Sequence, residues 1–213
     1  MAPSLDHGLF ITLEGGEGSG KSTLAAALAR ALEERRYTVC LTREPGGTQL
    51  GQAIERMFQQ HEAGDTPAPL AELFLFVADR AQHVSEKIAP ALAAGDIVVC
   101  DRFTDSSLAY QGFGRGLDLG FIRTLNEAAT GGLKPDLTLL LDLPPEVGLA
   151  RAPVQTDATG REHLDFHTRV REGFLQLARE EPGRFVVIDA TLPLDEVTKN
   201  ASAVIGRLLE LSA

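Results

Sequence analysis

Five short apolar runs alternate with segments of helical period along almost the whole chain. Few positions within the runs switch between apolar and polar residues, which is the pattern of strands buried on both faces. The runs cover Leu9–Glu14, Thr38–Thr42, Ile97–Cys100, Leu137–Leu143 and Phe185–Ile188. Because helical segments separate them, the pattern predicts an α/β fold, a five-stranded parallel sheet with helices on both faces.

The segments between these runs carry apolar residues three and four positions apart, as amphipathic helices do. Leu24, Leu28 and Leu32 form one such stripe. Gly112–Gly116 is predicted to be a loop, and Ala152–His163 shows little pattern. The predicted helices cover Lys21–Arg35, Gln49–Gln60, Leu70–Ala94, Ser106–Tyr110, Phe121–Thr130, Glu146–Ala150, Leu164–Arg179 and Leu194–Leu211.

The composition is that of an ordinary globular protein, with 44% apolar and 23% charged residues among 213. This length is sufficient for a full hydrophobic core, and we expect a single domain over residues 1–213. The formal net charge of −10 argues against partners that need a basic face, namely nucleic acids and anionic membranes.

Nothing in the sequence indicates export or membrane insertion. No apolar run approaches the roughly 20 residues of a membrane span, and residues 1–10 lack the basic and apolar stretches of a signal peptide. Cys40 and Cys100 lie in predicted strands, where buried thiols are more usual than a disulfide. These features predict a cytoplasmic protein.

The strongest chemical signal is the sequence GGEGSGKS at residues 15–22, between the first predicted strand and the first predicted helix. It matches G-x4-G-K-[ST], the P-loop, whose backbone N–H groups surround a phosphate at a helix N-terminus. Lys21 is expected to reach the β- and γ-phosphates and Ser22 to bind Mg²⁺. The predicted ATP-binding residues are Gly15, Gly16, Glu17, Gly18, Ser19, Gly20, Lys21, Ser22 and Thr23.

A P-loop is compatible with several functions, which the rest of the sequence separates in part. A GTPase switch is disfavoured because no N-K-x-D occurs and the D-x-x-G at Asp157–Gly160 does not follow a strand. A nucleotide-dependent binding module and a small kinase remain. Asp101 follows a predicted strand and can hold Mg²⁺ or its water, and Arg102 beside it can bind an anionic acceptor.

Three further motifs occur together with the P-loop: REPGGT at residues 43–48, FVADR at 76–80 and DRFTDSSLAYQG at 101–112. In this order they resemble the bacterial thymidylate kinases, from Phe10 to about Ala190. The resemblance implies a P-loop NTPase fold with a short lid over about residues 151–163. It further implies Mg²⁺-assisted phosphoryl transfer from ATP to dTMP in dTTP synthesis, and a homodimer.

The resemblance also implies roles for five residues that surround the base and the sugar. Phe76 would stack on the thymine, and Arg80, one helical turn later, would hydrogen-bond its O4. Ser107 would contact the base near N3, Tyr110 would crowd the 2′ position of the sugar, and Gln111 would add a polar contact.

For the acceptor's phosphate the resemblance points to Arg102, and for the sugar 3′-OH to Glu17. It places Glu44 near the acceptor's phosphate and a metal-bound water. Phe74, beside the base-stacking residue, is interpreted as a core residue.

Two features depart from the bacterial pattern. An Arg is frequent seven residues after the Thr of the PGGT turn, but Glu55 stands there and Arg56 follows it. One residue is about 100° of helix, so Arg56 is expected to face solvent. The second departure is a lid without an internal Arg, so Arg151 or Arg161 at its edges is expected to join Lys21 and Arg102 in catalysis.

Two alternatives stay open at this point. One is a kinase for another nucleoside monophosphate. The other is a P-loop nucleotide-binding module that has lost catalysis, supported by the sparse lid and by Glu55.

Overall fold

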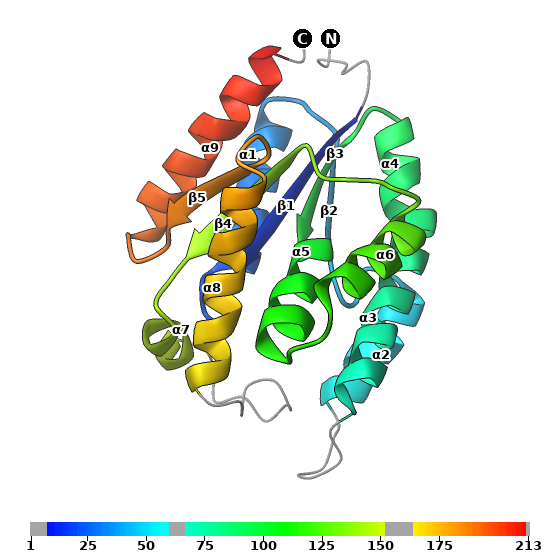
Figure 1. Ribbon diagram of the computed structural model, residues 1–213. Coiled ribbons are helices and arrows are strands. Elements are labelled where there is room, and N and C mark those ends of the chain that lie inside the picture. The colour runs from blue at the N-terminus through cyan, green and yellow to red at the C-terminus, as the bar shows by residue number, and fades with distance from the viewer. Residues whose placement is uncertain (1–7, 60–66, 152–163, 212–213) are drawn as a thin grey trace.

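The computed structural model describes residues 8–59, 67–151 and 164–211 (Figure 1). Its centre is a five-stranded sheet with the strand order β2-β3-β1-β4-β5, and every neighbouring pair is parallel. The strands are β1 (Leu9–Gly15), β2 (Val39–Arg43), β3 (Ile97–Asp101), β4 (Leu137–Asp142) and β5 (Phe185–Asp189). The predicted sheet is therefore confirmed, with strand ends displaced by one residue.

Helices cover both faces of the sheet (Figure 1). On one face α1 and α9 share a core with the strands, formed by residues such as Leu24, Leu28 and Ile205. On the other face Phe174, Ile122 and their neighbours join α8, α6 and the helix after β3 to β4 and β5. The helices are α1 (Lys21–Glu34), α2 (Gln49–Gln59), α3 (Pro69–His83), η1 (Val84–Ile88), α4 (Ala89–Ala93), α5 (Thr104–Ser107), η2 (Leu108–Gly114), α6 (Leu119–Thr130), α7 (Pro145–Arg151), α8 (Leu164–Glu180) and α9 (Leu194–Leu211).

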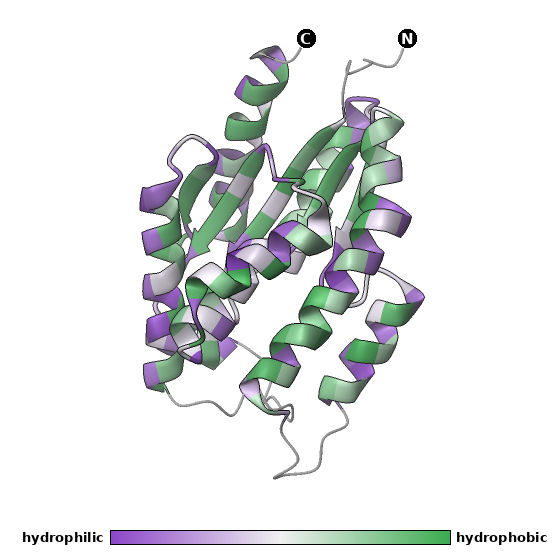
Figure 2. Ribbon diagram, turned by 45° about the vertical axis from the view of Figure 1, so that its right-hand side comes forward, coloured by the Kyte–Doolittle hydropathy of each residue, from purple (hydrophilic) through white to green (hydrophobic). Residues whose placement is uncertain are grey.

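Apolar residues concentrate on the strands and on the inward faces of the helices, as Figure 2 shows. The three central strands are almost entirely buried, whereas the edge strands expose Leu41 and Val187. The expectation that all strands are buried on both faces is therefore wrong for β2 and β5. Their outer residues face solvent because an edge strand has a neighbour on one side only.

The residues after β3 also differ from the sequence prediction. Gly112–Gly116 was expected to be a loop, but the helix that begins at Thr104 continues as the π-helix η2 to Gly114. Gly112 packs where a side chain would collide with Leu119, and Gly114 where one would collide with Phe166. These glycines therefore serve close helix packing instead of a turn.

The sheet register gathers the motif residues at one edge. In the register, Asp101 lies beside Leu13 on one side and beside Arg43 on the other. Gly15, which starts the P-loop, lies beside Leu141. Because all strands are parallel, their carboxyl ends meet at this edge, where ligands of such sheets bind. Among the described residues no helix is long and apolar enough to cross a membrane.

Candidate functional site

The P-loop connects β1 to α1 through backbone conformations that glycine adopts easily. Gly20, the residue before α1, has φ = 89°, a left-handed conformation that costs other residues about 1 kcal/mol or more. A side chain at Gly18 would lie 2.1 Å from the carbonyl oxygen of Gly148 in α7. The loop can therefore lie against α7 only with glycine at this position.

Lys21 is buried and its ammonium group closes the loop. Its Nζ donates to the carbonyl oxygens of Gly15 and Gly16 at 3.0 and 2.7 Å and to Ser19 Oγ at 3.2 Å. Burial, and then the nearby charge of Arg102, lower the pKa of Lys21 to about 8. Keeping Lys21 protonated in this buried position therefore costs free energy, and a bound anion would offset that cost.

We expect Lys21 to take up a proton when ATP binds at pH values near and above 8, where part of the free protein has released it. The phosphates of the nucleotide raise the lowered pKa, so ATP binds the protonated form more tightly and its Kd increases above about pH 8. Calorimetry between pH 7.5 and 9 in Tris and in Hepes measures this proton uptake. The Lys21→Met variant is the control, and equal proton uptake in both proteins would contradict the assignment.

Ser22 and Asp101 lie together beside the P-loop. Ser22 Oγ donates to Asp101 Oδ2 at 2.5 Å, although the two residues are 79 positions apart in the chain. Asp101 Oδ1 is buried and has no hydrogen-bond partner among the described residues. A buried carboxylate oxygen without a partner beside a hydroxyl group fits a hard cation or its water.

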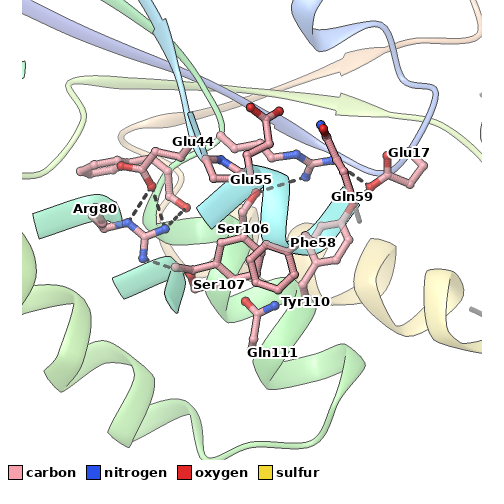
Figure 3. Close-up of a pocket in the computed structure, with 14 residues that line it drawn as sticks. Glu17, Glu44, Glu55, Phe58, Gln59, Arg80, Ser106, Ser107, Tyr110 and Gln111 are labelled. Carbon is pink, nitrogen blue, oxygen red and sulfur yellow. Dashed lines mark hydrogen bonds and ion pairs between the residues drawn. The ribbon is translucent and has the colours of Figure 1, made fainter. Parts of the chain in front are cut away.

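A pocket of about 220 Å³ opens next to the P-loop (Figure 3). All the residues that the sequence predicted for the acceptor site line it, and so do six that it did not. The predicted ones are Glu17, Glu44, Phe76, Arg80, Arg102, Ser107, Tyr110 and Gln111, and the others are Pro45, Glu55, Phe58, Gln59, Phe103 and Ser106. The structure therefore assembles residues from five segments of the sequence into one cavity.

Glu17 and Arg102 join the pocket to the P-loop. Arg102 Nη2 donates to Glu17 Oε1 at 2.9 Å, and the hydroxyl group of Tyr110 donates to the same oxygen at 2.9 Å. The guanidinium lies over the Tyr110 ring, 4.9 Å from its centroid. Its Nη1 contacts with Gly15 O and Ser106 Oγ are long, at 3.4 and 3.3 Å. These weak contacts leave Arg102 donors that an anion can take over.

Arg80 is held far more tightly than Arg102. Its Nε and Nη2 donate to Glu44 Oε2 at 2.9 and 2.8 Å, and Nη2 also donates to the Phe103 carbonyl oxygen at 3.0 Å. Nη1 donates to Ser107 Oγ at 3.0 Å and to Asn126 Oδ1 at 2.6 Å. All five N–H groups thus have partners, and Arg80 can read a base only by giving up one of them. The Ser107 hydroxyl group, which also lines the pocket, is the partner that can rotate away.

Glu14, which sequence reasoning did not single out, holds the residues after β3 in place. Its Oε1 accepts hydrogen bonds from the backbone N–H of Phe103 and Ser106, and its Oε2 accepts one from Ser106 Oγ. Burial and the charge of Asp105 raise the pKa of Glu14 to about 8. These bonds fix the backbone next to Arg102, whose φ of 70° is rare for a residue with a side chain. A charged residue at the end of an apolar strand was the available signal.

Phe58 on α2 is a pocket residue that the sequence motifs did not predict. Its ring stacks on Phe76 in a nearly parallel arrangement, with ring centroids 4.8 Å apart and an angle of 11°. Both rings line the pocket, so the base-stacking surface expected from Phe76 alone is a pair of stacked rings. Phe74, interpreted from the sequence as a core residue, is instead 47% exposed on α3.

The edges of the lid are described in part. Arg151 ends α7 and donates from Nη1 to the Ala190 carbonyl oxygen at 2.9 Å. Arg161 and the lid interior lie outside the described residues. Arg56 is exposed and does not line the pocket, whereas Glu55 does.

A P-loop at the carboxyl ends of a parallel sheet, with a pocket beside it that contains aromatic and guanidinium side chains, is the arrangement of a small P-loop kinase. Comparison with known proteins identifies the family. The family model for thymidylate kinase matches residues 13–201, and the chain belongs to this family.

Similar proteins support this assignment over nearly the full length. A thymidylate kinase of Synechococcus sp. (strain JA-2-3B'a(2-13)) is 56% identical over 204 residues, 96% of this chain and 97% of that one. One of Desulfovibrio desulfuricans is 52% identical over 210 residues, 94% and 96% of the two chains. The crystal structure of the Ehrlichia chaffeensis thymidylate kinase has a TM-score of 0.76 at 35% identity, covering 93% of this chain and 98% of that one.

Proposed function

We propose that the protein transfers the γ-phosphoryl group of ATP to dTMP, giving ADP and dTDP for dTTP synthesis. The observation that carries this proposal is the pocket, because every residue predicted for the acceptor lines it and two of them connect it to the P-loop: Glu17 belongs to the loop, and Arg102 donates to Glu17. Phe58 and Phe76 offer a flat apolar surface for a base, and Arg80 and Ser107 offer polar atoms at one edge.

The reaction needs charge neutralisation and positioning more than it needs a base. The attacking atom is an oxygen of the acceptor's phosphate, which is already anionic near neutral pH. Lys21 on the donor side and Arg102 on the acceptor side are placed to hold the two phosphates near each other. These interactions strengthen where the bound substrates displace water from the pocket.

We further propose that Ser22 and Asp101 hold Mg²⁺. Among the described residues no three His, Cys, Asp or Glu side chains form a metal cluster. The two side-chain oxygens of Ser22 and Asp101 suit Mg²⁺, which usually takes one or two protein oxygens together with substrate phosphates and water. When bound, the ion supplies charge neutralisation at the phosphates.

The experiment that tests the function is ADP release from Mg-ATP with no acceptor, dTMP, dUMP, AMP, CMP or GMP. We expect strong release with dTMP and weaker release with dUMP, which lacks the 5-methyl group. Release with a different monophosphate would overturn the roles of Phe76 and Arg80. ATP binding without acceptor-dependent release would contradict the kinase function.

Which lid Arg takes part stays a prediction, and so does the single-domain organisation over residues 1–213. Arg151→Ala and Arg161→Ala, alone and combined, separate the contributions of the two side chains to kcat. We place the reaction in the cytoplasm, whose ATP and monophosphate pools it would use.

We propose in addition that two copies of the chain form a homodimer through α2, α3 and α6. Large apolar side chains on these helices are exposed, which is unusual for a surface that stays free. They are Leu50, Met57, Leu70, Phe74 and Phe121. Light scattering should give twice the mass of one chain, and Phe74→Glu should reduce it to that of one. A single-chain mass for the parent protein would contradict the proposal.

A further inference from the structure

Glu55 lines the acceptor pocket, where its charge has the wrong sign for binding a phosphate. It lies on α2 and shares the pocket with two other carboxylates, Glu17 and Glu44, and with two guanidinium groups, Arg80 and Arg102. With all five groups ionised, the lining has one negative charge in excess. A dianionic monophosphate would therefore be bound more tightly if a further cation faced it.

Arg43, at the end of β2, is a cation within reach. Its Nη2 donates to both carboxylate oxygens of Glu55, at 2.7 and 2.6 Å. No other hydrogen bond of the Arg43 side chain occurs among the described residues. Its Nε and Nη1 are therefore donors available to a ligand.

The Arg43–Glu55 pair is the most easily opened of the three Arg–Glu pairs around the pocket. The side chains of Arg80 and Glu44 are 2% and 3% exposed, and their bonds fix the pocket wall. Those of Arg43 and Glu55 are 56% and 21% exposed. Water screens an exposed pair, which contributes little net stability, so an incoming anion can replace the carboxylate at small cost.

Arg43 also lies between the donor and the acceptor sides of the site. It lines a second hollow, of about 290 Å³, together with Ser22 and Asp101, the two residues assigned to Mg²⁺. Through Glu55 it borders the acceptor pocket as well. A cation in this position faces the region where the phosphoryl group must pass from donor to acceptor.

We propose that Arg43 is a phosphate-binding residue of the acceptor site and that Glu55 is the partner from which the acceptor's phosphate takes it. This proposal rests on the proposed function, because it concerns the same acceptor. It explains how a pocket with Glu at position 55 can still bind a monophosphate: the cation comes from β2 instead of α2. A neutral nucleoside gains nothing from this exchange, whereas the monophosphate does.

The test is the contribution of the phosphate to binding, measured by calorimetry as the ratio of the Kd for thymidine to the Kd for dTMP. We expect Arg43→Gln to lower this ratio about ten-fold or more, as loss of a charged hydrogen bond does, with the thymidine Kd unchanged within two-fold. Glu55→Gln removes the competing carboxylate and should raise the ratio several-fold. A ratio unchanged by Arg43→Gln, or lowered by Glu55→Gln, would overturn the proposal.

The single variant Arg43→Gln also leaves the carboxylate of Glu55 without its partner, which could itself repel the phosphate. The same substitution is therefore also tested in the Glu55→Gln variant. In that variant the loss of Arg43 leaves no unpaired carboxylate at position 55. The double variant should therefore again show a ratio about ten-fold below that of Glu55→Gln alone. Equal ratios would mean that Arg43 does not contact the phosphate.

Arg56→Gln is the matched control, because Arg56 is the neighbouring exposed Arg on α2 and lies outside the pocket. It should change neither Kd. If the parent protein binds neither thymidine nor dTMP, the proposed function is wrong. If it binds both and the Arg43 variants keep the parent ratio, only the role of Arg43 is wrong.

Discussion

Replacing Lys21 by Met should lower kcat by about 10³-fold or more without lowering the melting temperature. The Nζ group is the positive charge nearest to the loop that would hold the transferred phosphate, and removal of such a cation from a phosphoryl-transfer site typically costs this much. Stability should respond in the opposite sense. Burial lowers the pKa of Lys21 to about 8, so the folded protein holds the ammonium at a cost near pH 7.

The sign of the pH dependence provides a second readout. The unfolded chain keeps the Lys21 proton up to its ordinary pKa of 10.5, whereas the folded protein releases it near 8. The cost of the buried ammonium is therefore complete below pH 8 and disappears between pH 8 and 10.5, so the parent gains stability there. Lys21→Met should lack this gain. Lys199→Met, an exposed position on α9, is the control and should preserve both kcat and the pH profile.

Replacing Arg80 by Met should destabilise the protein by about 3–5 kcal/mol and abolish measurable dTMP binding. Removing one partner of a buried ion pair leaves the other charge uncompensated, and that accounts for most of the expected cost. Here the remaining partner is Glu44, which is 3% exposed and, among the described residues, would retain His83 as its one side-chain partner, at 3.1 Å. Urea denaturation followed by circular dichroism measures the change in the free energy of unfolding.

A double variant separates the two losses. Arg80→Met with Glu44→Gln removes the uncompensated carboxylate, so part of the lost stability should return. Binding of dTMP should not return, because the guanidinium that faces Ser107 in the pocket is still absent. If the single variant unfolds at the same urea concentration as the parent, Arg80 does not carry the charge balance of the pocket wall.

Local patterns in the sequence were sufficient to predict the fold. Apolar runs and helical periods depend on neighbours within about one or two turns, so they predicted the sheet and its helices. The P-loop is one continuous segment, and its strand and helix context is also local. The family motifs then supplied the acceptor residues, and the parallel sheet explains why strands distant in the sequence deliver them to one edge.

The type of each helical turn and the exact ends of the helices could not be predicted from the spacing of apolar residues. The segment Leu70–Ala94 was predicted as one helix, and the structure resolves it into α3, η1 and α4. A π-helical turn differs from an α-helical one by a shift of the hydrogen-bond partner, which leaves almost no trace in the spacing of apolar residues. For the same reason the continuation of η2 to Gly114 was missed.

The tertiary structure alone determines which polar and charged side chains contact one another. Glu14 binds Ser106 across 92 positions of the chain, and Ser22 meets Asp101 across 79. The sequence marked Glu55 as a departure from the family, but only the placement of α2 in the structure shows that Glu55 pairs with Arg43 at the end of β2. Such pairings depend on strand register and helix placement to within about an ångström, because hydrogen bonds weaken steeply beyond their narrow distance range. Residue types and spacings alone do not contain that precision.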